Sequence, residues 1–498
     1  MKKTALTTLT IVRRTLGYGL LVTLVSIISI AIYVLEQRAD LSIWHEVDLD
    51  EEFEAKSDVS DFAGYLELED RLFAQLESKV YQETPPGDPK SIERYHKGSR
   101  TDPTSMATNW NRTFVDECDQ PTAGVLLLHG MSDSPYSLRH LAAKFRDAKA
   151  SVIGLRIPGH GTAPSGLIET TWKDMAAAVR LAAVHLKQKI GDKPLYVVGY
   201  SNGGALSVVY ALESISDPSL PRPDGLILIS PEIGVSKAAA LAVWQGRVGH
   251  WLGLDKLAWN SISMEYDPFK YGSFAINAGD QAYRITAAID KHLDKMSKSG
   301  SLSDFPPTLA FQSSVDATVS APALVSRLFD RLPDNGHEIV LFDINRVELI
   351  EHLLAKDPRD DLEKILNGPN HPYSLSVVSN ASADSNPTLQ VSIKHRSAGQ
   401  SETLTTPTDM AWPKDIFSLS HVALPFPESD PLYGSGDGGK IPTLGNRALR
   451  GERGTLHISP GEMLRQKWNP FYPWLEKRCL EFTKLAPAGS SEPTSSDN

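Results

Sequence analysis

Residues 195–206 read LYVVGYSNGGAL, and this stretch decides how the rest of the chain is interpreted. Apolar and aromatic residues come first, as in a buried strand, and a helical run follows directly. Between them Ser201 is flanked by Gly199 and Gly203, which remove side chains that would crowd a sharp turn. The pattern predicts a strand, a tight turn and a helix, with the hydroxyl of Ser201 exposed at the carboxyl edge of a sheet.

Short apolar runs alternate with helical runs on both sides of this turn. This alternation predicts an α/β fold, a mostly parallel sheet covered by helices on both faces. The expected core covers 106–234 and 306–484, interrupted by a helical cap insertion at 235–305. A hairpin insertion is expected near 372–396, where YSLSVVSN and TLQVSIKH alternate like two antiparallel strands.

The first segment looks unlike the rest. Residues 15–35 carry no charge and, as a helix, would extend roughly 31 Å, the thickness of a bilayer core. They predict a transmembrane anchor, although a cleaved export signal or a buried helix remains an alternative. Basic residues precede the segment and acidic residues follow it, so 1–14 should be cytoplasmic and the catalytic domain non-cytoplasmic, facing the periplasm in a Gram-negative envelope. Residues 36–105 are expected to form a stalk helix and linker, and 485–498 a disordered tail.

Composition limits the choice of partner. The 498-residue chain has a formal charge of −11 and no long basic run, which argues against nucleic acid. Its two cysteines, Cys118 and Cys479, form no metal-ligand pattern. They could form one disulfide outside the cytoplasm or remain buried thiols, and both alternatives stay open. The oligomeric state is also left open.

The serine turn needs an acid and a base. Residues 199–203 match G-x-S-x-G, and a serine hydroxyl is a poor nucleophile without an aligned base. The acid is expected after the next parallel strand, which favours Asp316 in TLAFQSSVDATVS. Its competitors lie before that strand, in a helix or at its far edge: Asp304, Asp330 and Asp334.

The base is the hardest residue to choose, because the chain has fourteen histidines. His421 is favoured, since it follows a short apolar strand and precedes a proline-rich loop that could fold back over Ser201. His352 is the runner-up, because it follows the strand after the acid strand. His337 begins a strand and should therefore lie at the wrong edge of the sheet.

An oxyanion intermediate needs backbone donors. Asn202, next after the nucleophile, would supply one N–H group. Met131, in the loop LLLHGMSDSP, is the second expected donor. His129 and His160 are interpreted as structural residues that position their loops.

These motifs resemble those of the α/β-hydrolases, most closely the carboxylesterase and monoacylglycerol-lipase-like branch. The resemblance covers roughly 109–485 and rests on the motifs LLLHGMSDSPYSLRHLA, GLRIPGHGTAPSGL, VVGYSNGGALSVVYAL, SSVDATVS and SLSHVALPFPESDPLYG. It implies Ser201 as nucleophile, Asp316 as acid, His421 as base, oxyanion donors at Met131 and Asn202, and no metal or organic cofactor. The chain departs from the family in its N-terminal segments and in an acid-to-histidine interval of about a hundred residues, several times the usual one.

The sequence therefore predicts a membrane-anchored serine hydrolase that cleaves carboxylic esters, with a small ester or a lipid such as an acylglycerol or lysophospholipid as substrate. Aromatic residues in the cap could line an acyl-chain site or could simply pack the cap onto the core: Trp244, Trp251, Trp259, Phe269, Tyr271 and Phe274. An acyltransferase or peptidase with the same triad, or a non-catalytic binding module on the same fold, are the alternatives.

Overall fold

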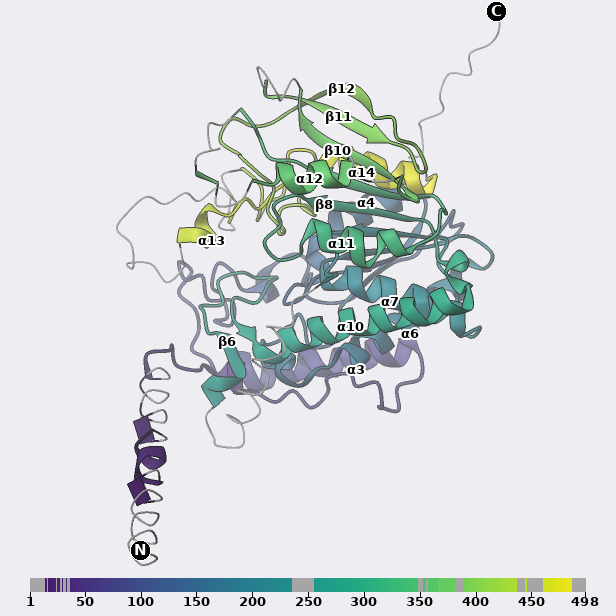
Figure 1. Cartoon of the computed structure of the whole chain (residues 1–498). Coiled ribbons are helices and arrows are strands. Elements are labelled where there is room, and N and C mark those ends of the chain that lie inside the picture. Colours follow the sequence, from purple (N-terminus) through teal and green to yellow (C-terminus); the bar gives the residue numbers. More distant parts are fainter. Residues whose placement is uncertain are drawn as a thin grey trace, which may run out of the picture.

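A computed structural model shows one large sheet between two layers of helices (Figure 1). It describes residues 14–15, 17–23, 25–26, 29, 33, 36–234, 255–347, 353–354, 357–366, 368, 370–381, 388–436, 444–445 and 460–485. Predictions for Trp244, Trp251 and His352, for residues 1–13 and for nearly all of the tail lie outside these residues.

Ten strands form the main sheet within the described residues, in the order β1-β3-β2-β4-β5-β8-β9-β10-β11-β12. The seven central strands, β3, β2, β4, β5, β8, β9 and β10, are parallel, whereas β1, β11 and β12 pair antiparallel at the edges. The predicted mostly parallel sheet is confirmed. The strands are β1 Phe114–Asp116, β2 Gly124–Leu128, β3 Ser151–Leu155, β4 Leu195–Tyr200, β5 Gly225–Ile229, β8 Thr308–Ser313, β9 His337–Phe342, β10 Tyr373–Asn380, β11 Gln390–Arg396 and β12 Leu404–Ala411.

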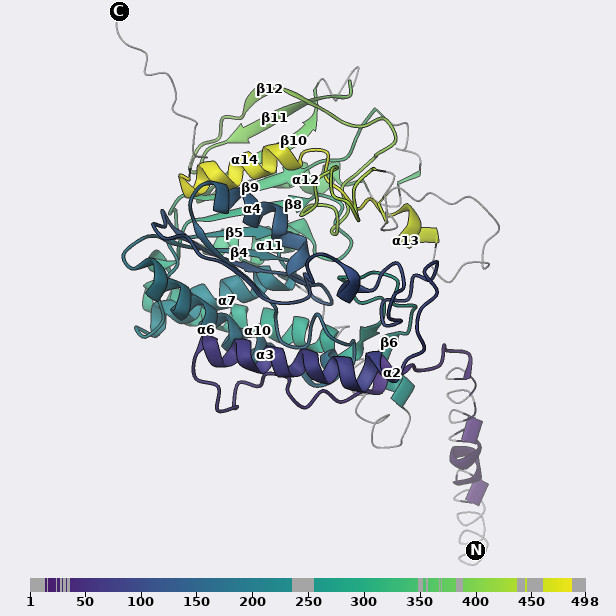
Figure 2. The ribbon, with the colours of Figure 1, turned by 180° about the vertical axis from the view of Figure 1, so that it is seen from behind.

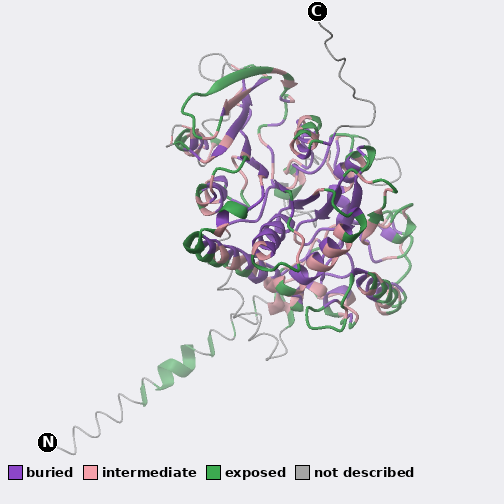
Figure 3. Ribbon diagram, turned by 90° about the vertical axis from the view of Figure 1, so that its right-hand side faces the viewer, coloured by how far each residue is buried: buried purple, intermediate pink, exposed green. Residues whose placement is uncertain are grey.

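Each face of the sheet has its own hydrophobic core. Alternate strand residues pack against α3, α6, α7, α10, α11 and α12 on one face and against α4 and α14 on the other (Figure 2). The helices of these two layers are α3 Phe62–Leu76, α4 Arg139–Asp147, α6 Trp172–Ile190, α7 Asn202–Ser216, α10 Ile276–Ser299, α11 Ala321–Arg327, α12 Arg359–Leu366 and α14 Tyr472–Thr483. The sheet is therefore the most deeply buried part of the molecule (Figure 3).

Shorter elements connect these layers. The short helices are α2 Ile43–Glu46, η1 Glu77–Tyr81, η2 Pro103–Ser105, η3 Pro135–Leu138, α5 Gly166–Glu169, η4 Asp255–Ala258, η5 Ser301–Asp304, η6 Phe329–Arg331 and α13 Pro460–Leu464. Strands β6 Trp259–Ser261 and β7 Phe274–Ala275 form a small antiparallel sheet.

The region predicted as a hairpin insertion extends the main sheet. The predicted antiparallel pairing is confirmed, because β10 and β11 pair in register from Leu375 with Arg396 to Asn380 with Val391. Strand β10 also pairs in parallel with β9, so the hairpin continues the sheet at its edge. The segment that connects β8, the strand before Asp316, to His421 therefore runs alongside the core.

The segment predicted as a stalk packs against the core. Asp61 caps α3 by accepting a hydrogen bond from the Gly64 N–H at 2.8 Å. Arg156, fully buried after β3, forms ion pairs with Glu52 at 2.9 Å and with Glu69 of α3 at 3.2 Å. A buried guanidinium needs such partners, so the N-terminal segment supplies the two carboxylates that the core itself lacks there.

The described part of the predicted cap comprises α10 and the short elements η4, β6, β7 and η5. Helix α10 lies in the same layer as α6 and α7 (Figure 1), and its Ile285, Ile289 and Leu293 are part of the core on that face. Although α10 belongs to the segment predicted as a cap, it packs in the helix layer that covers this face of the sheet.

The predicted localisation on the non-cytoplasmic side of a membrane is wrong on the evidence of the structure. Within the described residues no helix combines the length and apolar content needed to cross a bilayer. The prediction of a transmembrane anchor rested on residues 15–35, of which 16, 24, 27–28, 30–32 and 34–35 lie outside the described residues. Cys118 and Cys479 are free thiols.

Candidate active site

The turn after β4 holds Ser201 in an unusual backbone conformation. Ser201 has φ 53° and ψ −117°, in a region that side chains other than glycine rarely adopt. A Cβ at Gly203 would lie 2.0 Å from the Leu128 carbonyl oxygen, and one at Gly199 would lie 2.3 Å from the Gly203 carbonyl oxygen. Both glycines are therefore required for strand and helix to meet so closely, and the turn leaves Ser201 6% exposed.

Two side chains distant in sequence reach this hydroxyl. The Nε2 atom of His421 lies 2.9 Å from Oγ of Ser201. Nδ1 of the same ring lies 2.7 Å from Oδ2 of Asp316. The three residues favoured from the sequence thus form one continuous hydrogen-bonded chain.

Asp316 is arranged to stay ionised. Its side chain is fully buried, and burial alone would favour the neutral acid. The charge and hydrogen bond of His421 and the N–H groups of Val319 and Thr318, at 2.9 and 2.8 Å, outweigh burial and hold the pKa of Asp316 below its usual value. An ionised Asp316 can fix the tautomer of His421 in which Nδ1 carries the proton.

The loop that carries His421 is tied to the ends of two neighbouring strands. Oγ of Ser313, at the end of β8, donates to the Leu419 carbonyl oxygen at 2.8 Å. The backbone N–H of Asn345, after β9, donates to the Phe417 carbonyl oxygen at 2.7 Å. These bonds bring the chain back from β12 to the carboxyl edge of the sheet, where Ser201 lies.

The loop after β2 adjoins the serine. A Cβ at Gly130 would lie 3.1 Å from Cβ of Ser201, so the backbone of this loop passes close to the serine. Met131 is the next residue of the loop. His129 holds this loop, because its Nε2 accepts a hydrogen bond from the Ile157 N–H at 3.0 Å. Asn202 is the first residue of α7, where backbone N–H groups point out of the helix.

Two of the competing acids bond other residues, and the competing base that the structure describes lies away from Ser201. Asp304 pairs with Arg222 at 3.2 Å, and Asp330 accepts a hydrogen bond from the Tyr373 hydroxyl at 3.2 Å. His337 begins β9, as predicted, at the opposite edge from Ser201. Within the described residues, no group of three or more His, Cys, Asp or Glu side chains is placed to hold a metal ion.

Sequence reasoning missed Glu232. It follows β5 in the motif SPEIG, and its backbone N–H donates to the Ser201 carbonyl oxygen at 2.9 Å. The residue is 8% exposed, and its Oε2 atom has no hydrogen-bond partner among the described residues. Burial, and next the charge of Asp316, raise the pKa of Glu232 to about 7. A carboxylate three residues after the end of a wholly apolar strand was the signal that could have identified it.

The cap aromatics that the structure describes are used in packing. Trp259 is buried with its ring 5.0 Å from that of His45. Phe269 stacks on Tyr136 with ring centroids 4.2 Å apart. Tyr271 is buried as well, with its hydroxyl accepting from the Thr162 N–H at 2.9 Å. These three residues therefore favour the packing alternative over an acyl-chain lining.

Comparison with known proteins assigns the class. A profile of the serine aminopeptidase S33 family matches residues 119–346. The thermostable monoacylglycerol lipase of Bacillus sp. strain H-257 is 27% identical over 219 residues, which cover 44% of this chain and 79% of the relative. The chain is an α/β-hydrolase. More narrowly, it is a serine ester hydrolase of the carboxylesterase and monoacylglycerol-lipase-like branch.

Solved structures of similar proteins include lipolytic enzymes. One is described in work on LipS and LipT, two metagenome-derived lipolytic enzymes. It is 21% identical in sequence, the match covers 52% of this chain and 99% of that chain, and the TM-score is 0.37. Another is the monoacylglycerol lipase of Paleococcus ferrophilus, with 21% identity, 47% and 89% covered, and a TM-score of 0.35.

Proposed function

We propose that Ser201, His421 and Asp316 form the catalytic triad and that the enzyme hydrolyses esters through an acyl-enzyme. The observation that carries the proposal is the unbroken pair of hydrogen bonds from Ser201 Oγ through the His421 ring to Asp316. A ring bonded on both nitrogens in this way can accept a proton on one side while the carboxylate stabilises the resulting charge on the other.

In the proposed mechanism, Oγ of Ser201 attacks the ester carbonyl carbon while Nε2 of His421 takes the hydroxyl proton. The backbone N–H groups of Met131 and Asn202 would bind the oxyanion that forms on the carbonyl oxygen. The imidazolium of His421 then protonates the leaving alcohol. Water, deprotonated by the same ring, attacks the acyl carbon and releases the acid and free Ser201.

We further propose an acylglycerol or another lipid-derived ester as the substrate. The support is the similarity to the Bacillus monoacylglycerol lipase, since the described cap aromatics contribute packing. Aminopeptidase activity is the second candidate. It is favoured by the description of the matching family and by the buried carboxyl group of Glu232 beside Ser201, which could bind an ammonium group when ionised.

The first experiment identifies the nucleophile. A fluorophosphonate probe should label the wild-type chain, and Ser201→Ala should abolish labelling and lower kcat for ester hydrolysis by about 10⁴- to 10⁶-fold. Ser214→Ala is the matched control, because Ser214 is buried on α7, the helix that begins directly after Ser201, and its hydroxyl donates to the Ala211 carbonyl oxygen. Undiminished labelling of Ser201→Ala would remove Ser201 from the mechanism.

A substrate panel then separates the two candidates. Nitrophenyl esters from acetyl to dodecanoyl, a monoacylglycerol and an alanine nitroanilide are assayed with the same preparation. The proposal expects kcat/KM to be highest for the lipid esters. Faster cleavage of the anilide than of every ester would replace the esterase assignment with the peptidase.

A further inference from the structure

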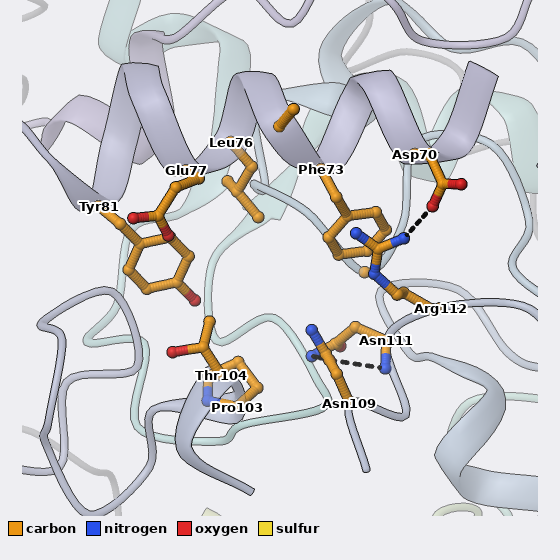
Figure 4. Close-up of a pocket in the computed structure, with 12 residues that line it drawn as sticks. Asp70, Phe73, Leu76, Glu77, Tyr81, Pro103, Thr104, Asn109, Asn111 and Arg112 are labelled. Atoms are coloured by element: carbon orange, nitrogen blue, oxygen red, sulfur yellow. Dashed lines mark hydrogen bonds and ion pairs between the residues drawn. The ribbon is translucent and has the colours of Figure 1, made fainter. Parts of the chain in front are cut away.

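A cavity lies away from the triad. It has a volume of about 260 Å³ and opens between α3 with η1 above and the 103–112 segment below (Figure 4). Neither Ser201, Asp316 nor His421 is among the residues that line it. The lining consists of Asp70, Phe73, Ala74, Leu76, Glu77, Tyr81, Pro103, Thr104, Asn109, Asn111, Arg112 and Gly161.

A local change of helix type shapes this cavity. The regular turns of α3 give way at Glu77 to a π-helical turn that ends at Tyr81, and the Gln82 N–H donates to the Glu77 carbonyl oxygen at 3.0 Å. A π turn accommodates an extra residue and re-aims the side chains that follow, and such turns are frequent at functional sites. Here both ends of the turn, Glu77 and Tyr81, line the cavity.

Tyr81 presents an unused hydroxyl. The residue is only 4% exposed, yet its hydroxyl forms no hydrogen bond with any described residue, and it points into the cavity (Figure 4). The hydroxyl is therefore accessible to a ligand in the cavity. Burial raises the pKa of Tyr81, so the group remains a protonated donor.

The opposite wall carries complementary polar groups. Oδ1 of Asn109 accepts from the backbone N–H and side-chain Nδ2 of Asn111 at 3.2 and 3.1 Å, which leaves the Asn109 amide N–H₂ group facing the cavity. Glu77 uses Oε1 to pair with Lys97 at 2.5 Å, and its second oxygen can accept a hydrogen bond.

The charged groups of the lining are already paired. Arg112 forms an ion pair with Asp70 at 2.7 Å, and its guanidinium lies 4.1 Å over the Phe73 ring. Glu77 is neutralised by Lys97. The cavity therefore offers donors, acceptors and an apolar wall formed by Leu76 and Pro103, without an unpaired charge to hold a strongly charged ligand.

We propose that this cavity binds a neutral polyhydroxyl molecule of the size of a single sugar ring. Hydroxyl groups both donate and accept, so they match the Tyr81 hydroxyl, the Asn109 amide and the Glu77 carboxylate together, while the C–H face of the ring packs on Leu76 and Pro103. The volume equals that of roughly nine water molecules at about 30 Å³ each, which admits one ring and excludes a long acyl chain.

The test is a titration of the full chain, followed by saturation-transfer NMR, with D-glucose and myo-inositol as probes and D-glucuronate as the charged comparison. Tyr81→Phe keeps the ring and removes the hydroxyl, and it should weaken binding of the neutral probes about five- to tenfold, as expected for one lost hydrogen bond. Tyr283→Phe on α10 is the matched control and should leave binding unchanged. Ser201→Ala should bind the probes like the wild type.

Asn109→Ala provides a second variant, so that the result does not depend on Tyr81→Phe folding. Circular dichroism checks the fold of both variants. The proposal is overturned if neither neutral probe binds, if D-glucuronate binds more tightly than D-glucose, or if binding survives in both cavity variants and disappears when the fluorophosphonate occupies Ser201.

Discussion

Asp430 anchors the segment that follows His421, and replacing it should affect both stability and activity. Its carboxylate has no exposed surface. It binds five donors at 2.6 to 3.0 Å: Arg139 Nη2, His140 Nε2, the Tyr136 hydroxyl, and the backbone N–H groups of Leu432 and Tyr433. Tyr136 lies in η3 and Arg139 begins α4, so this cluster joins the His421 segment to the helix that follows the Gly130 loop.

The size of the effect follows from the burial of these partners. Arg139 is 9% exposed, and Asp430→Ala would leave its charge buried and unpaired, which typically costs about 3–5 kcal/mol. Asp430→Asn retains a similar shape and should cost about 1.5–3 kcal/mol, the range for hydrogen bonds to charged groups. Because a shift of about 1 Å in a reacting group can lower a rate by about 10²-fold, kcat of Asp430→Ala should fall by roughly tenfold to a hundredfold.

The pH dependence of this cluster has a defined sign. Burial favours the neutral acid, but the His140 hydrogen bond and the Arg139 charge outweigh it and hold the pKa of Asp430 below its usual range. A lowered folded-state pKa gives stability that is complete above the unfolded pKa of about 3.9 and is lost as the pH falls below it. The wild-type advantage over Asp430→Asn should therefore shrink in acid.

Urea unfolding followed by tryptophan fluorescence measures the free energy of unfolding, and steady-state ester hydrolysis measures kcat. Asp304→Ala is the control, because Asp304 pairs with Arg222 at the surface, where such pairs contribute about 0–1 kcal/mol. If Asp430→Ala unfolds with the same free energy as Asp304→Ala, the carboxylate does not hold the segment in place and the reasoning fails.

Two further predictions concern carboxyl groups beside Ser201. Asp316→Asn should keep the fold but favour the wrong tautomer of His421, lowering kcat by about 10⁴-fold; a loss smaller than tenfold would contradict the role of Asp316. Glu232 titrates near a pKa of about 7 when folded and near about 4.3 when unfolded, so the unfolded state loses its proton first and wild-type stability should fall as the pH rises between these values. Glu232→Gln should remove this decline. Urea unfolding at about pH 4.3 and about pH 7 measures it, and an equal loss of unfolding free energy in Glu232→Gln and the wild type would show that this carboxyl group is not responsible.

The serine turn could be predicted from the sequence because its requirements are local. Gly199, Ser201 and Gly203 lie within five residues, and the backbone that they form depends on close contacts inside one strand–turn–helix unit. Asp316 was accessible for a similar reason, since the carboxyl ends of parallel strands meet at one edge of a sheet. Glu232 was at the same edge, but its burial without a partner is visible only in three dimensions.

What the sequence determined, then, was the succession of apolar strands and helices and the strained serine turn, because periodicity and glycine spacing act over a few residues. Only the tertiary structure decided which histidine meets that serine, because β10 to β12 join the sheet edge and the bonds of Ser313 and Asn345 return the His421 loop across it. It also decided where the N-terminal segment lies. The buried Arg156 pairs with Glu52 and Glu69. These partners lie about a hundred positions earlier in the chain, so no local sequence pattern could predict the pairing.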